Sequence, residues 1–132
     1  MSVGKNILSD YLHVRDGGRT DAIDSSASFW EDLARGSYPQ LDQGRLMSAF
    51  EFSESWATWE RHPAGEELVM LLSGTATLVL EEDGEEHTVE LTGPGQYILV
   101  PQGVWHTART SVATSMLFLT PGDGTEHRPV GV

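Results

Sequence analysis

The sequence predicts an all-β domain, built as an antiparallel sandwich or barrel. From about residue 45, eight short apolar segments follow one another, turn residues separate them at regular spacing, and no long helical segment interrupts them. An Asp-Gly pair in "EEDGEE", which favours a tight hairpin, separates the fourth segment from the fifth. The eight expected strands are RLMSAFEF (45–52), SWATWERH (55–62), ELVMLLS (67–73), TATLVLE (75–81), HTVEL (87–91), QYILV (96–100), VWHTAR (104–109) and ATSMLFLT (113–120).

The 132 residues are expected to form a single domain with three parts, because no linker composition or internal repeat divides them. Residues 1–44 are expected to be an N-terminal arm that packs on the barrel, irregular up to residue 24, with "DGGRTD" marking a loop. Residues 45–120 are expected to form the barrel. Residues 121–132 are expected to be a loop-like tail that lies across the barrel or a partner.

One short helix is expected within the N-terminal arm, in "SSASFWEDLARGS". Ser28 is a suitable N-cap, Glu31 completes a capping box three residues later, and Gly36 fits the C-terminal stop. Phe29 and Leu33 lie four residues apart, beside Trp30, and form a small apolar face. We expect this face to cover the sheet.

The composition excludes several classes of protein. The chain has 20 acidic and 8 basic residues, a formal net charge of -12, so a nucleic-acid partner is not expected. Cysteine is absent, which removes disulfides, thiolate metal ligands and a cysteine nucleophile. The start "MSVGKNILSD" lacks the apolar run of a signal peptide, and no segment is long and apolar enough to span a membrane. We therefore expect a cytoplasmic protein without a membrane partner.

The stretch "WERHPAGEE" carries the first group of chemically active side chains. Residues two apart in a strand face the same side, so Glu60 and His62 are expected to converge on one surface. Two more carboxylates, Glu66 and Glu67, follow the Pro-Ala-Gly bend, and since neighbours in a strand face opposite sides, one of them would face solvent. A second stretch, "PGQYILVPQGVWH", supplies His106. Together the two stretches resemble a metal-binding pocket.

The two stretches resemble the two conserved motifs of the cupin superfamily. The first family motif runs His-x-His, three or four residues, Glu, six residues, Gly. Here Glu60 stands in place of the first His, while His62, Glu67 and Gly74 match. The second family motif runs Gly, five residues, Pro-x-Gly, two residues, His, three residues, Asn, and it is matched in this chain by Gly95, Pro101, Gly103 and His106, with Thr110 in place of the final Asn.

The resemblance implies a jelly-roll barrel of the cupin (RmlC-like) type with a short N-terminal helix and a metal site inside it. Glu60, His62, Glu67 and His106 would be the ligands, and four N and O donors without sulfur suit a divalent Mn, Fe, Co, Ni or Zn ion. Two carboxylates make the site harder than the usual three-His set, which favours Mn or Fe. Glu60 could instead orient a ligand His as a hydrogen-bond acceptor, or be a buried acid with a raised pKa.

The resemblance leaves the activity open, because the fold hosts many chemistries. The leading hypothesis is a small metal-dependent enzyme of the oxygenase, isomerase, decarboxylase or lyase type that acts on a polar small molecule. No catalytic acid or base can be assigned. The alternatives are a non-catalytic module that binds or senses a small ligand, and a metal-free barrel in which Glu60 pairs with His62. A homodimer is expected, because related cupins pair through sheet edges.

The remaining histidines and aromatic residues have plainer interpretations. His13 lies in the arm and His87 beside the acidic hairpin, while His127 lies in the tail, where it could close a partner's pocket. The residues expected to line the cavity, or else to belong to the core, are Trp56, Thr58, Val69, Leu71, Tyr97, Trp105, Met116 and Phe118.

Overall fold

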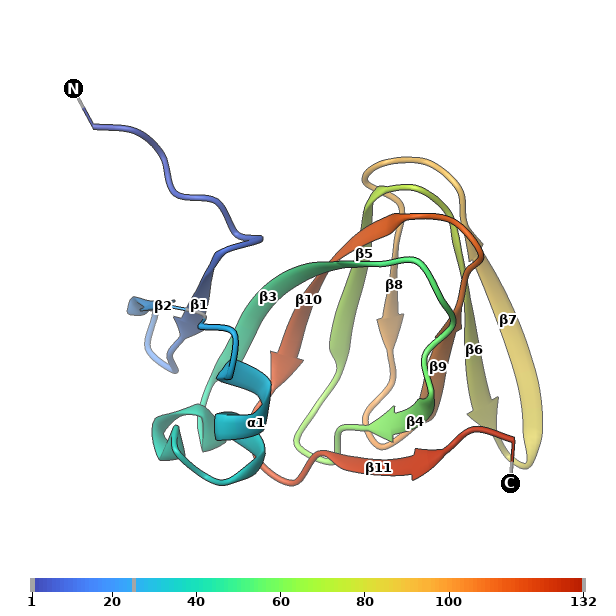
Figure 1. The fold of residues 1–132 in the computed structure, drawn as a ribbon. Coiled ribbons are helices and arrows are strands. Elements are labelled where there is room, and N and C mark those ends of the chain that lie inside the picture. Colours follow the sequence, from blue (N-terminus) through green and yellow to red (C-terminus); the bar gives the residue numbers. More distant parts are fainter. Residues whose placement is uncertain (1, 25, 132) are drawn as a thin grey trace.

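The computed structural model describes residues 2–24 and 26–131, which form two antiparallel sheets curled into a barrel (Figure 1). The six-stranded sheet contains, in spatial order, β2 (Thr20–Asp24), β1 (Asp10–Val14), β3 (Arg45–Phe52), β10 (Thr114–Pro121), β5 (Glu67–Ser73) and β8 (Tyr97–Val100). The five-stranded sheet contains β11 (Glu126–Pro129), β4 (Thr58–Arg61), β9 (Trp105–Arg109), β6 (Ala76–Glu82) and β7 (Glu85–Leu91). The helices are α1 (Phe29–Ala34) and the 3-10 helix η1 (Pro39–Asp42). The predicted all-β fold is confirmed.

All eight predicted segments form strands, with small differences at their ends. β3 and β5 have the predicted limits, whereas β4 is reduced to the last part of its segment. The Asp-Gly hairpin is also confirmed, because Asp83 and Gly84 both have positive φ angles, 54° and 79°, and Glu82 pairs with Glu85 across the turn. This conformation suits the right-handed twist of the flanking strands.

The prediction of an irregular chain up to residue 24 is wrong. β1 and β2 form a hairpin around the expected loop, and β1 adds to the edge of the six-stranded sheet through β3. The alternation in β1 is disguised because its inward positions are Tyr11 and the polar His13. His13 is only 3% exposed, and its Nε2 lies 2.7 Å from the carbonyl oxygen of Gln43.

The tail is not wholly loop-like, because β11 pairs with β4 along four residues. The sequence "EHRP" of this strand has no apolar alternation, since its side chains are largely exposed. The tail thus lies along the barrel as an edge strand, next to the strand that carries Glu60 (Figure 1).

Helix α1 forms where it was predicted, but the capping box does not. Ser28 occupies the N-cap with φ −97° and ψ 8°, and its Oγ donates to Asp32 Oδ2 at 2.9 Å instead of receiving a backbone N–H. Gly36 ends the helix as predicted, with φ 81° and its N–H donating to the carbonyl of Leu33. Phe29, 1% exposed, packs in a small cluster beside the sheet with Tyr11, Leu41 and Leu46.

The barrel interior changes from apolar to polar along each inner strand. On β5 the inward residues run from Leu71 and Val69, both 0% exposed, to Glu67. On β9 they run from Ala108 to His106. The apolar end forms the main core, and the polar ends of neighbouring strands meet. This arrangement places the ionisable side chains together in the interior.

Gly74, the last residue of the first cupin-like motif, ends β5 in a tight turn. Its φ is 76°, and a Cβ at this position would overlap the carbonyl oxygen of Ala113. A side chain here would therefore be strained and would also clash with the backbone.

The described residues include no helix long and apolar enough to cross a membrane.

Candidate metal centre

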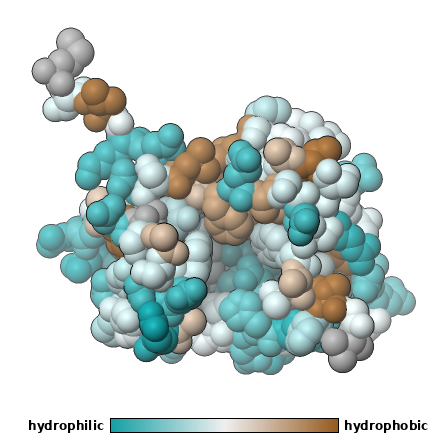
Figure 2. All heavy atoms as spheres, viewed as in Figure 1, coloured by the Kyte–Doolittle hydropathy of each residue, from teal (hydrophilic) through white to brown (hydrophobic). Residues whose placement is uncertain are grey.

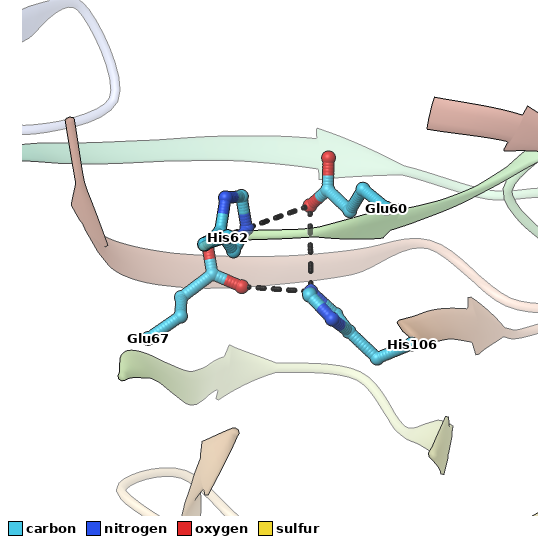
Figure 3. Close-up of side chains that lie close together, drawn as sticks. All are labelled: Glu60, His62, Glu67 and His106. Atoms are coloured by element: carbon cyan, nitrogen blue, oxygen red, sulfur yellow. Dashed lines mark hydrogen bonds and ion pairs between the residues drawn. The ribbon is translucent and has the colours of Figure 1, made fainter. Parts of the chain in front are cut away.

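Three strands of the two sheets bring Glu60, His62, Glu67 and His106 together (Figure 3). Glu60 lies in β4 and pairs in register with His106 of β9, while His62 directly follows β4. Glu67 is the first residue of β5, in the opposite sheet. One ligand atom from each side chain can be chosen so that all four lie within 4.8 Å of one another. The four could therefore hold one metal ion.

The two histidines face the carboxylates through their Nε2 atoms. His106 Nε2 lies 2.9 Å from Glu67 Oε1, and His62 Nε2 lies 3.2 Å from Glu67 Oε2. Glu60 Oε1 stands slightly further off, 3.7 Å from His62 Nε2 and 3.6 Å from His106 Nε2. Figure 3 shows the four side chains converging in this way. Each residue thus offers at least one donor atom to a common centre.

Partners behind the cluster fix the orientation of these groups. His106 Nδ1 lies 3.1 Å from the carbonyl oxygen of Val104, which can only accept a hydrogen, so Nδ1 carries one and the lone pair of the neutral ring is on Nε2. His62 Nδ1 lies 2.9 Å from Thr125 Oγ1. Thr120 Oγ1 donates to Glu67 Oε2 at 2.6 Å. Such backing hydrogen bonds hold metal-ligating rings and carboxylates in place.

The buried Nε2 of His62 tests whether this set fits a metal. Among the described residues it is the one buried side-chain N or O atom without a hydrogen-bond partner, although His62 is only 4% exposed. Glu67 and His106 are 2% and 0% exposed, and the ion pairs of the described residues join Glu60 and Glu67 to histidines alone. The Nε2 of His62 faces the carboxylate oxygens of Glu67 and Glu60 without hydrogen-bond geometry, and a buried polar atom that makes no hydrogen bond is costly. A divalent ion would satisfy it, so the donor set fits.

The charges of the cluster shift its titration strongly. Burial alone would lower the pKa of both rings, but the facing carboxylates of Glu60 and Glu67 outweigh it, raising the pKa of His62 to about 9 and that of His106 to about 10. Burial likewise opposes the ionised carboxyls, yet the facing histidines hold the pKa of Glu60 and of Glu67 below the usual range. The alternative of Glu60 as an acid with a raised pKa is therefore wrong.

His127 stands at the mouth of the cluster, on β11, in register with Glu60. Its Nε2 lies 3.4 Å from Glu60 Oε2, and its side chain is 56% exposed. The hydrogen bond with Glu60 raises the pKa of His127. Glu60 thus presents one oxygen to the inner histidines and the other to His127. The tail histidine lies over the site of its own chain.

A cavity of about 920 Å³ opens onto the cluster. Glu60, His62 and Glu67 line its polar end, and Figure 2 shows this face of the molecule hollowed at its centre, with hydrophobic residues beside the hollow. Other lining residues are Trp30, Leu33, Ala34, Leu41, Asp42, Leu46, Ser48, Phe50, Trp56, Ala57, Thr58, Phe118, Thr120, Pro121, Gly122, Asp123, Gly124, Thr125 and His127. This volume suits a small molecule.

The expected cavity residues divide into three groups. Trp56, Thr58 and Phe118 line the cavity, whereas Val69, Leu71 and Met116 are fully buried core. Tyr97 is 58% exposed on the edge strand β8, and Trp105 packs against Arg61 and Arg128 beyond the cavity lining.

Several residues of the candidate site were not predicted from the sequence. Thr120 lies two residues after Phe118 in β10, so alternation alone places it on the inner face. Thr125 precedes a strand that was not predicted, and no pattern in the sequence singles it out. Trp30 and Phe50 reach the cavity from the N-terminal arm and β3, which only the packing of the arm on the barrel reveals.

The comparisons agree with this architecture. Among solved structures, a cupin-2 domain containing protein from Shewanella frigidimarina has a TM-score of 0.50 at 16% identity, over 58% of this chain and 70% of that one. A cupin superfamily protein from Desulfitobacterium hafniense has a TM-score of 0.50 at 23% identity, over 60% and 68%. Oxalate oxidase in complex with the substrate analogue glycolate has a TM-score of 0.54 at 15% identity. The match covers 65% of this chain and only 46% of that one.

At these identities the structural likeness establishes the fold alone, and no curated protein matches the chain. The family assignment comes from the sequence. The family model described as a cupin domain matches residues 49–128, which contain both motifs and all four residues of the candidate metal centre. The chain therefore belongs to the cupin-domain family.

Proposed function

We propose that this protein is a metal-dependent enzyme that acts on an oxygen-bearing small molecule, with Glu60, His62, Glu67 and His106 as the metal ligands. The buried Nε2 of His62, which makes no hydrogen bond among the described residues and faces the carboxylates of Glu60 and Glu67, is the observation that carries the proposal. Two imidazoles and two carboxylates are donors for a divalent Mn, Fe, Co, Ni or Zn ion, and the two carboxylates favour Mn or Fe.

When bound, the ion would supply Lewis acidity toward substrate oxygens or, as Fe(II), reactivity toward dioxygen. The chain's own residues would do the rest. The Val104 carbonyl holds the His106 ring by its Nδ1, and Thr125 holds the His62 ring in the same way, so that each Nε2 points to the centre. Thr120 donates a hydrogen bond to Glu67 and fixes that carboxylate. The apolar wall of the cavity would exclude water around the substrate, which strengthens every electrostatic interaction at its polar end.

The reaction would be of the oxygenase, isomerase, decarboxylase or lyase type. Outside the proposed ligands, the cavity lining offers three titratable side chains among the described residues: Asp42, Asp123 and His127. Of these, His127 contacts a proposed ligand, with its Nε2 3.4 Å from Glu60 Oε2. Its Nε2 is thus placed to hold a proton at the mouth of the site.

A panel of oxygen-bearing metabolites tests the proposal. We expect the protein loaded with Mn or Fe(II) to turn over at least one compound, and His106→Ala, which lacks a proposed ligand, to lose that turnover. His87→Ala provides a matched control, because His87 is exposed on β7. Turnover by the metal-free protein, or by His106→Ala, at the rate of the metal-loaded parent would refute a metal-dependent activity.

A second candidate is a non-catalytic module that binds or senses a small ligand. The exposure of His127 favours it, since no buried acid or base other than the proposed ligands lines the described cavity. Saturable binding of a compound to the metal-loaded protein, without chemical change in that compound, would support this candidate over the enzyme.

A further inference from the structure

We infer that the cavity selects an uncharged or positively charged ligand with a flat apolar body and an oxygen-bearing end, and that it rejects anionic acids. The inference rests on the proposed function, since it places the oxygens at the metal end. It goes further by naming the ligand class from the shape and charge of the cavity wall.

The apolar part of the wall is aromatic. The Phe50 and Phe118 rings are stacked with centroids 4.9 Å apart and an angle of 20° between planes. Trp56 lies 5.7 Å from Phe118, and Trp30 meets Phe50 edge-on at 5.8 Å. All four side chains line the cavity. Rings arranged in this way offer both faces and edges to a flat ligand.

The charged part of the wall is acidic. Glu60 and Glu67 lie at the metal end, and Asp42 and Asp123 line the cavity elsewhere with largely exposed side chains. The described lining contains no Lys or Arg, and neither aspartate forms an ion pair with a basic side chain of the described residues. Among the described lining residues, the one histidine that is not a proposed metal ligand is His127, and it already faces Glu60.

A bound ion does not reverse this balance. Both histidines would ligate as neutral rings, so the charges of Glu60 and Glu67 cancel the two positive charges of the ion. Apart from His127, which pairs with Glu60, no surplus positive charge remains for a carboxylate, while the two aspartates repel it and attract an amine. Arg61 lies between Glu60 and His62 in the sequence but does not line the cavity. It forms an ion pair with Glu126 and lies over the ring of Trp105.

A series of three matched catechols tests the inference. Ethylcatechol, dopamine and dihydroxyphenylacetate share one ring and two adjacent hydroxyls, but are neutral, cationic and anionic at neutral pH. Calorimetric titration of the zinc-loaded protein, which avoids redox chemistry, should give dissociation constants for the first two at least about tenfold below that of the third. Oxalate should bind no better than dihydroxyphenylacetate. Binding of either acid that is as tight as that of ethylcatechol, or tighter, would overturn the inference.

The aspartates have their own variant. Replacing both Asp42 and Asp123 by Asn should reduce the preference for dopamine over ethylcatechol about threefold, whereas Asp16→Asn, on the exposed loop after β1, should leave it unchanged. An unchanged preference in the double variant would overturn the role given to these carboxylates.

Failure of this inference can be told apart from failure of the proposed function. Zinc content is measured before each titration, and the series is repeated on metal-free protein, where the aromatic and acidic walls persist and the same order of affinities is expected. Loss of zinc binding with the order preserved would refute the metal site alone. Zinc binding with the order reversed would refute the ligand class alone.

Discussion

Replacing Glu60 by Gln removes one charge from the centre at nearly constant volume. The structure places Glu60 Oε1 3.6 Å from His106 Nε2 and 3.7 Å from His62 Nε2, so an ion shared by these rings would also lie close to this oxygen. Two opposite unit charges about 4 Å apart attract each other by roughly 4 kcal/mol at the effective dielectric constant of partly exposed sites. Glu60 is 21% exposed, which fits that setting.

Part of this energy is offset. Without Glu60, the pKa values of His62 and His106 fall, so fewer protons must leave before a metal can bind. We therefore expect a net loss of about 2.7 kcal/mol, which is about a hundredfold increase in the dissociation constant for the divalent ion.

Competition titration with a chromophoric chelator measures this constant. Glu66→Gln is the matched control, because Glu66 is the exposed neighbour of Glu67 and should bind metal as the parent does. Glu60→His should keep a site and shift its preference toward Ni or Zn. Parental affinity in Glu60→Gln would show that the carboxylate is not a ligand, and the centre would then consist of the other three residues.

Further predictions concern the rest of the centre and the assembly. His106→Ala should lose most of the bound metal by elemental analysis, and retention of one ion per chain would contradict its role as a ligand. Thr125→Val should weaken metal binding by about tenfold without unfolding the protein, because it removes only the partner of His62 Nδ1, and unchanged affinity would contradict that role. In the metal-free protein the raised pKa values of His62 and His106 contribute their full stabilisation of the fold below about pH 6.5. Denaturant titrations should show this contribution to the free energy of unfolding, on the order of 3 kcal/mol, disappearing as the pH rises through about 9 to 10. A free energy of unfolding that does not change over this pH range would contradict the pairing of these histidines with the carboxylates. Light scattering should find a homodimer, and a monomer at micromolar concentration would contradict it.

The sequence predicted the barrel strands because their patterns agree with their environments. In β5 an apolar run from Leu68 to Leu72 marks the strand, although residue type does not separate its buried positions, Glu67, Val69 and Leu71, from their half-exposed neighbours. The hairpin at Asp83-Gly84 was predicted because its two positive φ angles demand such residues. Strands β1 and β11 were missed because polar residues such as His13 fill inward positions or because the strand is exposed on both faces.

The candidate centre was predicted only as a set of donors. Strand alternation and the two motifs brought Glu60, His62, Glu67 and His106 to one surface. The partners that orient the rings could not be found in this way, since Thr125 meets His62 from 63 positions along the chain. The same holds for His127, whose contact with Glu60 depends on the pairing of β11 with β4. Long-range packing, which no local pattern encodes, sets these contacts.

Anomalous diffraction from crystals of metal-loaded protein, recorded on both sides of the absorption edge of the loaded element, tests the central claim most directly. The account predicts one anomalous peak per chain, with donor atoms of Glu60, His62, Glu67 and His106 at about 2.0–2.3 Å from it. Absence of any peak at this centre after loading with Mn, Fe, Co, Ni and Zn in turn would contradict it.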